Sequence, residues 1–115
     1  MSRHTKYIQE MLKKLEQGYE YVESPNKLVT IHRGCRKTLH NPTKLVQYIE
    51  VYHYGTLILT ISYDDSLRYI SYNGKSFVIG EFAYSPTDAR IINQFIEKYV
   101  PGWTAHSRKG EVIVD

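Results

Sequence analysis

The sequence predicts an α+β fold in which a mainly antiparallel sheet of roughly five to seven short strands carries two helices. Residues 44–79 alternate in period two and are rich in β-branched and aromatic residues, which is typical of strands. Residues 2–17 and 85–100 instead repeat apolar residues at helical spacing. A chain of 115 residues is long enough to bury one core, so we expect a single domain over residues 1–115.

The alternation in residues 44–79 predicts which side chains point into the core. The residues expected to point inward are Leu45, Ile49, Val51, Leu57, Leu59 and Ile61. Asn73-Gly74 predicts a tight hairpin turn, because both residues accept positive φ. We therefore interpret this segment as a β-meander with one apolar face and one face of tyrosine, threonine and serine side chains.

The two helices carry clear start and stop signals. Gly18 is expected to end the N-terminal helix in a left-handed conformation. Ser85 is the expected N-cap of the second helix, with Pro86 at its first position and Asp88 as the acid of a capping box. The apolar stripes of both helices predict that they cover the apolar face of the sheet.

The remaining segments predict further strands and one loop. Residues 27–33 alternate as a strand, and a Lys109-Gly110 turn predicts a terminal hairpin. Trp103 is expected to anchor the core rather than to bind a ligand. Residues 32–42 form the densest cationic stretch and, because they contain Gly34, are predicted to be loop-like.

Charge is spread unevenly along a chain whose formal net charge is +3. Residues 1–44 hold nine Lys/Arg and four Glu, whereas residues 45–115 hold six Lys/Arg and eight Asp/Glu. A basic N-terminal third indicates attraction to an acidic partner, although an ordinary solvated surface gives the same pattern. Cys35 is the one cysteine, so a reducing compartment is expected. Without an apolar run of membrane-spanning length or a signal peptide, we expect a cytoplasmic protein without membrane contact.

Tyrosine is enriched, at 11 residues of 115, which suits contact surfaces and base stacking. The sequence therefore predicts a site for nucleic acid or a protein partner, with cations for phosphates and rings for unpaired bases. The candidate residues are Arg33, Arg36, Lys37, Lys44, Tyr48, Tyr52 and Tyr54, with Tyr69 and Tyr72 as further stacking candidates. The alternative is that these rings pack across strands or beneath the first helix.

Two other functions remain open at this stage. The same tyrosine-rich face would serve a homodimer or another protein-interaction module without nucleic acid. His32 and His40 would be the acid and base of a metal-independent nuclease, with the neighbouring cations stabilising the developing charge. No metal site or cofactor is expected, because no Cys/His pair has zinc-ligand spacing and no glycine-rich phosphate loop is present.

The C-terminal half resembles a class of small uncharacterised bacteriophage and archaeal-virus proteins. The residues that carry the resemblance are Tyr54-Gly55-Thr56, Arg90-Ile91-Ile92-Asn93, Gly102-Trp103, Lys109-Gly110 and Val112-Ile113-Val114. The resemblance implies a viral origin, and no catalytic residues carry over from it. Together with the composition it predicts a small non-enzymatic binding protein of the host cytoplasm that contacts nucleic acid or a host nucleic-acid-handling, defence-related complex.

Overall fold

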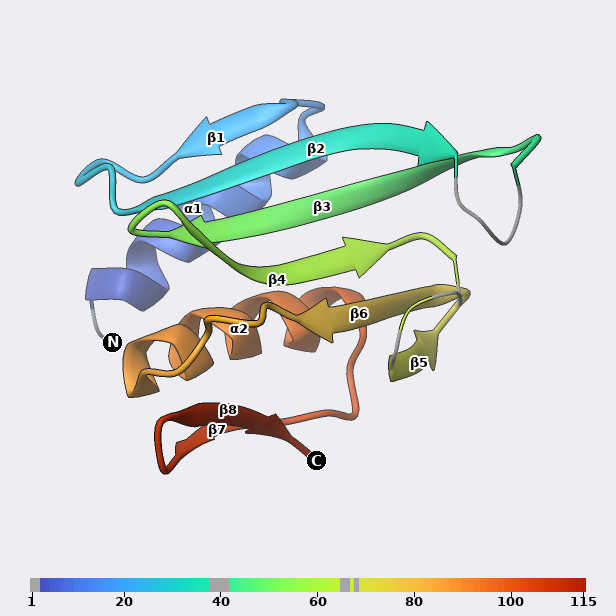
Figure 1. Ribbon diagram of the computed structural model, residues 1–115. Helices are drawn as coiled ribbons and strands as arrows, with labels where there is room; N and C mark the ends of the chain where they lie inside the picture. The colour runs from blue at the N-terminus through green and yellow to red at the C-terminus, as the bar shows by residue number, and fades with distance from the viewer. Residues whose placement is uncertain (1–2, 38–41, 65–66, 68) are drawn as a thin grey trace.

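The structure, a computed structural model, describes residues 3–37, 42–64, 67 and 69–115. Its elements, in chain order, are α1 (Arg3–Glu16), β1 (Tyr21–Glu23), β2 (Val29–Lys37), β3 (Leu45–His53), β4 (Thr56–Ser62), β5 (Tyr69–Tyr72), β6 (Lys75–Ile79), α2 (Pro86–Tyr99), β7 (Ala105–Arg108) and β8 (Glu111–Val114). The prediction of an α+β fold with a mainly antiparallel sheet is confirmed (Figure 1).

The main sheet has six strands in the order β1-β2-β3-β4-β6-β5, and every neighbouring pair is antiparallel. The predicted meander is wrong in one respect, because β6 rather than β5 pairs with β4. The register places Phe77 of β6 opposite Ile61 and Ile79 opposite Leu59, so the more apolar strand takes the central position. The Asn73-Gly74 turn then folds the four-residue strand β5 onto the edge of the sheet, with φ values of 52° and 72° at the turn.

Strand β2 extends further than the sequence predicts. Its residues pair continuously with β3, from Val29 opposite His53 to Lys37 opposite Leu45. The prediction of a loop from residue 32 is therefore wrong as far as Lys37, and residues 38–41 lie outside the described part. Gly34 does not interrupt the strand, since a partner strand supplies its backbone hydrogen bonds and any residue can adopt its conformation.

Both helices lie on one side of the sheet, behind it in Figure 1. A single hydrophobic core joins them to the strands. Its fully buried members include Ile8, Met11 and Leu15 from α1, Ile31, Ile49, Val51, Leu59, Ile61 and Phe77 from the sheet, and Ile91, Ile92, Phe95 and Ile96 from α2. The hydrophobic effect of this one-sided burial is the main source of stability in the fold.

A β-bulge changes the predicted inward pattern in β4. Between Val51 and Tyr52 the register shifts, so that Val51 faces Leu59 and Tyr52 faces Leu57. Ile58, predicted to point away from the core, is consequently 1% exposed and belongs to it. Leu45, predicted to point inward, is 63% exposed at the start of β3, where it lies beyond the core.

The β7-β8 hairpin is attached to α2 and, through Trp103, to strands β5 and β6 on the side of the sheet that carries the helices. The Asn93 amide of α2 donates to the Ala105 carbonyl at 2.6 Å and accepts from the Ala105 N–H at 2.7 Å. Trp103, which precedes β7, lies edge-on to Phe77 and Tyr69, with ring centroids 5.9 and 5.3 Å away. These contacts confirm Trp103 as a core anchor.

We predict that Gly80→Ala destabilises the fold by about 1–3 kcal/mol, because overpacking a well-packed interior costs this much. Gly80 donates to the Ile58 carbonyl at 2.8 Å, and a Cβ there would lie 2.0 Å from the Leu57 carbonyl oxygen. Urea denaturation followed by circular dichroism measures the loss. Gly74→Asn is the control, since Asn tolerates its positive φ and nothing lies within 4 Å. Equal stability of the two variants contradicts the prediction.

Candidate functional site

One face of β1–β3 points away from both helices, and we call it the outer face. Three rings form a row across these strands. Tyr21 and His32 meet edge to face with centroids 4.9 Å apart, and His32 meets Tyr52 in the same way at 5.2 Å. Tyr21 is 50% exposed, His32 is exposed and Tyr52 is half-buried. The row therefore presents ring edges and faces to solvent on three adjacent strands.

A stacked cation extends the row along β2. The Tyr48 ring lies across Gly34, since a Cβ at Gly34 would be 2.9 Å from the Tyr48 hydroxyl. The guanidinium carbon of Arg36 lies 4.5 Å from the centroid of the same ring. Such a stack holds a long side chain in place while leaving its N–H donors available in the plane. Tyr21, His32, Arg36, Tyr48 and Tyr52 together form what we call the outer-face cluster.

Carboxylates also lie beside this cluster. The Tyr21 hydroxyl donates to Glu23 at 3.1 Å. Burial raises the pKa of Tyr52, and the negative charge of Glu50 raises it further. The Tyr52 side chain is therefore neutral at physiological pH. The positive charge of the face is concentrated at the end of β2, where Arg36 and Lys37 are exposed.

Five of the seven predicted contact residues lie on this face or at its cationic end. Arg36, Tyr48 and Tyr52 belong to the outer-face cluster, Lys37 ends β2, and Lys44 is exposed immediately before β3. The β2–β3 pairing brings Lys37 opposite Leu45, next to Lys44 in the chain, so the two lysines approach the same end of the sheet.

Arg33 lies elsewhere. It pairs with the buried Ile49, which places it on the side of the sheet that carries the helices. Its Nη1 donates to the Leu15 carbonyl at 2.8 Å, near the end of α1. The turn of α1 at this point is closed by the Gly18 and Tyr19 amides, which bond back to Leu15 and Lys14. Arg33 thus stabilises the C-terminus of the helix and is not part of the outer-face cluster.

The other predicted tyrosines are dispersed. Tyr54 occupies the β3–β4 turn, separated from Lys44 by the whole of β3, about 30 Å at the rise of an extended strand. Tyr69 stacks on Phe77 with centroids 4.8 Å apart and planes 16° apart, so it packs against the core instead of lying on the outer face. Tyr72 is 50% exposed at the end of β5.

The predicted pair of nuclease histidines is described only in part. His32 lies between Tyr21 and Tyr52 in the outer-face cluster. His40 lies outside the described residues. The structure therefore gives no geometry for the proposed acid and base.

Sequence reasoning missed a buried histidine–aspartate pair. The Nδ1 of His53, at the end of β3, lies 2.6 Å from Oδ1 of Asp88 in α2, and both side chains are at most 7% exposed. Oδ2 of Asp88 accepts from the backbone N–H groups of Tyr84 and Ser85, at 3.1 and 3.2 Å, while the Asp88 N–H donates to Ser85 Oγ at 3.0 Å. One carboxylate thus completes the predicted capping box and joins α2 to the sheet.

A sequence signal for this pair exists. Period-two alternation places His53 on the inward face with Ile49 and Val51, and a buried imidazole needs a hydrogen-bond partner.

Burial alone would raise the pKa of Asp88, but hydrogen bonds from His53 and from the Tyr84 and Ser85 backbone outweigh the effect of burial and lower this pKa. Asp88 is therefore ionised at neutral pH.

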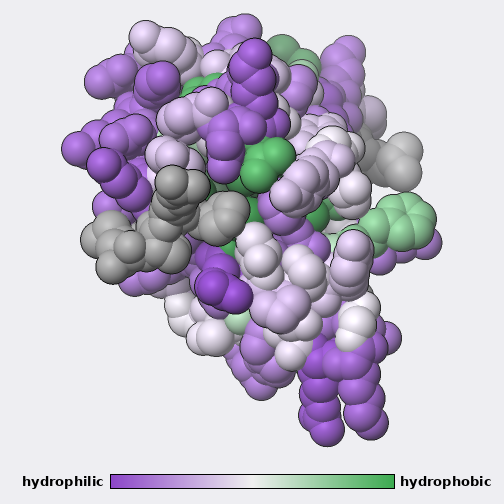
Figure 2. Space-filling model, turned by 90° about the vertical axis from the view of Figure 1, so that its left-hand side faces the viewer, coloured by the Kyte–Doolittle hydropathy of each residue, from purple (hydrophilic) through white to green (hydrophobic). Residues whose placement is uncertain are grey.

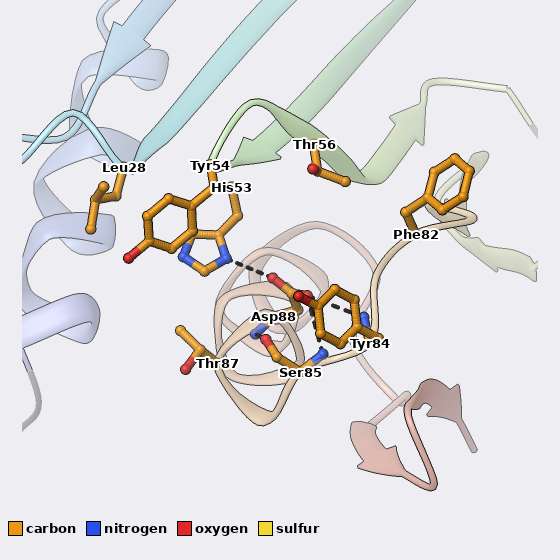
Figure 3. A pocket seen from close by; sticks show the side chains of 9 residues that line it. All are labelled: Leu28, His53, Tyr54, Thr56, Phe82, Tyr84, Ser85, Thr87 and Asp88. Atoms are coloured by element: carbon orange, nitrogen blue, oxygen red, sulfur yellow. Dashed lines mark hydrogen bonds and ion pairs between the residues drawn. The ribbon is translucent and has the colours of Figure 1, made fainter.

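A pocket of about 310 Å³ opens beside this pair. Its lining residues are Leu28, His53, Tyr54, Thr56, Phe82, Tyr84, Ser85, Thr87 and Asp88 (Figure 3). Three of the lining rings are largely exposed: Tyr54 at 71%, Phe82 at 68% and Tyr84 at 61%. Figure 2 faces this end of the molecule and shows apolar side chains in a hollow among polar ones. The pocket and the cationic end of β2 lie at opposite ends of the sheet.

The described residues contain no group of three or more His, Cys, Asp or Glu side chains suited to hold a metal ion. Neither helix in the described part of the chain is long and apolar enough to cross a membrane. In comparisons with known proteins, no family model, no curated protein and no solved structure matches this chain. Inferences about function therefore depend on the residues and geometry described above.

We predict that Asp88→Asn lowers the free energy of unfolding by about 1–3 kcal/mol at pH 7, because it weakens a cap and the bond to buried His53. Because the pKa of Asp88 is lower in the folded state than its usual value of 3.8, the ionised carboxylate stabilises the fold at pH values above 3.8. This contribution is lost as the pH falls through the folded-state pKa.

The difference in the free energy of unfolding between wild type and Asp88→Asn should therefore be largest near neutral pH and shrink below about pH 3.8. Urea denaturation at a series of pH values measures it. Glu97→Gln removes an exposed carboxylate of the same helix and serves as the matched control. A difference that does not change with pH rules out the proposed linkage.

Proposed function

We propose that this protein binds single-stranded nucleic acid through the outer face of β1–β3 and catalyses no reaction. The observation that carries the proposal is the outer-face cluster, a row of three rings continued by an arginine stacked on a fourth. It lies on the sheet face opposite the helices and next to two exposed lysines.

The rings support contact with unpaired bases. Unpaired bases stack on aromatic side chains that stand on adjacent strands, and each stack contributes about 1–3 kcal/mol. Tyr21, His32 and Tyr52 stand on β1, β2 and β3, so their spacing follows that of neighbouring strands, about 4.8 Å. A duplex keeps its base faces internal, which is why we infer a single strand.

The charges indicate which part of the outer face contacts phosphates and which part contacts bases. Phosphates are attracted to Arg36, Lys37 and Lys44, which gather at the end of β2 and the start of β3. Glu23 and Glu50 lie towards the rings instead and disfavour phosphates there. The backbone of the strand would therefore follow the cationic end, with bases extending over Tyr52 and His32 towards Tyr21.

The viral resemblance of the C-terminal half completes the proposal. A viral protein with this face would bind nucleic acid, or a host nucleic-acid-handling complex, in the host cytoplasm. A second copy of the chain is the competing occupant of the same face, and the experiments below distinguish the two.

We expect wild-type protein to bind a fluorescent oligothymidylate with an affinity that falls steeply with salt. Arg36→Gln with Lys37→Gln should weaken binding and reduce the slope of log affinity against log salt by roughly 1.4, because each phosphate contact on a single strand contributes about 0.7. Fluorescence anisotropy at several salt concentrations gives both values.

The matched control is Arg90→Gln with Arg108→Gln, which removes the same charge from exposed positions on α2 and β7. An equal loss in the control means that net charge alone drives binding. Wild-type protein that fails to bind, but forms a dimer in light scattering, assigns the outer face to a second copy.

We also predict that Tyr52→Leu weakens oligonucleotide binding by about tenfold without changing the salt slope, because a stacking contact is lost while the phosphate contacts remain. Tyr72→Leu removes a half-exposed ring at the other edge of the sheet and should bind as wild type does. The stacking argument fails if both variants bind equally.

A further inference from the structure

The pocket beside the His53–Asp88 pair is a second site, separate from the outer-face cluster. Its volume of about 310 Å³ is at the lower end of the range for pockets that hold small molecules, about 300–1,000 Å³. It lies where the β3–β4 turn meets the segment before α2, so two parts of the chain far apart in sequence form its walls.

Exposed rings flank this pocket on several sides. Figure 3 shows Tyr54 and Phe82 at opposite sides, Tyr84 near the start of α2, and the Asp88 carboxylate between them. Each ring is more than 60% exposed. Single exposed rings are ordinary on protein surfaces, but a group of them around one hollow marks a contact site.

The position of Tyr54 strengthens this interpretation. Its φ is 53° and that of Gly55 is 75°, so both central residues of the turn are left-handed. Such a turn favours Asn or Asp at the first position, as in Asn73-Gly74, and disfavours a bulky ring. Turn geometry therefore does not explain this tyrosine, whose ring packs against His53 with centroids 4.6 Å apart. The contact with the His53 ring does explain it, and this contact holds the Tyr54 ring beside the pocket.

The charges of the pocket select the kind of ligand. None of the nine described residues that line it is Lys or Arg. Besides the tyrosines, its titratable side chains are the Asp88 carboxylate, ionised at neutral pH, and His53, which is bonded to that carboxylate. A phosphate or carboxylate ligand would be repelled there. A cation would be attracted both by Asp88 and by the negative faces of the rings.

The hydrogen bonds of Asp88 narrow the choice further. Its oxygens already accept from His53 and from the backbone of Tyr84 and Ser85. A primary ammonium carries three N–H donors and is strongly hydrated, so it needs hydrogen-bond acceptors in the pocket. The Asp88 oxygens already accept other hydrogen bonds and are poorly available for this. An alkylated ammonium has few or no N–H groups and binds through ring faces and charge alone.

We propose that the pocket formed by Tyr54, Phe82, Tyr84 and Asp88 binds an organic cation with an alkylated ammonium group. The rings contact the alkyl groups, and Asp88 balances the charge from beneath. The group belongs to a small molecule or to the methylated lysine of a protein, and the chemistry recognised is the same in both.

Choline and 3,3-dimethylbutan-1-ol are the test probes, because they have nearly the same shape and only choline is charged. We expect choline to shift the backbone amide resonances of residues 54, 82, 84 and 88 in two-dimensional NMR. The neutral alcohol should bind at least about tenfold more weakly. Equal binding of the two probes, or no saturable shift with choline, overturns the proposal.

Phe82→Leu and Tyr84→Leu remove the rings while keeping the backbone N–H groups that cap α2. Each should weaken choline binding by about tenfold or more. Tyr72→Leu, at the opposite edge of the sheet, should leave it unchanged. A melting temperature near that of wild type shows that each variant is folded, and loss of choline binding in all three variants contradicts the assignment.

A peptide carrying trimethyl-lysine and the matched unmethylated peptide identify the source of the cation. Tighter binding of the methylated peptide than of choline assigns the pocket to a protein partner, and the reverse order assigns it to a small molecule. Binding of the unmethylated peptide as tightly as the methylated one contradicts the requirement for alkylation. Oligonucleotide binding is measured separately, so failure here does not affect the outer face.

Discussion

The structure depends on burial of one face of the sheet. Two helices and one hairpin are available to cover six strands, and all of them pack on the same side. The other face must consequently be compatible with water. Tyrosine, histidine and threonine meet this requirement, since each favours or tolerates a strand and carries a polar group. The residues that make the outer face compatible with water are thus the ones on which the proposed binding depends.

The junction of β3 with α2 fixes how the covering layer sits on the sheet. Asp88 forms hydrogen bonds there with three groups: the Ser85 hydroxyl that caps the helix, the Tyr84 backbone N–H and the His53 ring. Because one carboxylate holds the end of a central strand against the start of a helix, the pocket beside it has walls of defined position. The length of the β2–β3 ribbon separates this pocket from the cationic end of the sheet, so the two proposed sites do not overlap.

Features set by neighbouring residues were predictable from the sequence. The capping box at Ser85, the left-handed stop at Gly18 and the Asn73-Gly74 turn each depend on a few adjacent positions, and all three are confirmed. The predicted apolar stripe of α2 is buried as well, at Ile92, Phe95 and Ile96.

Features set by distant residues were not predictable. The pairing of β6 with β4 depends on which strand offers the better apolar match, and the bulge near Tyr52 reverses the expected direction of Ile58. In the candidate site, Tyr48 was expected on the tyrosine-bearing face of the sheet, whereas Arg36 was expected in a loop and instead lies over Tyr48 from β2. Arg33 was assigned to the same site because residues 32–42 were predicted to be loop-like, whereas in β2 it lies on the side of the helices and bonds to the end of α1. His53 was treated as isolated because its partner lies 35 residues away.

The end of β2 has one further consequence. Strand β1 pairs only with Thr30, Ile31 and His32, so the last residues of β2 border β3 on one side and no described strand on the other. An open edge of this kind invites another chain to add a strand and begin an aggregate. Arg36 and Lys37 occupy that edge, and their charges oppose such pairing. The two cations proposed to contact phosphates would therefore also disfavour edge-to-edge pairing of one chain with another.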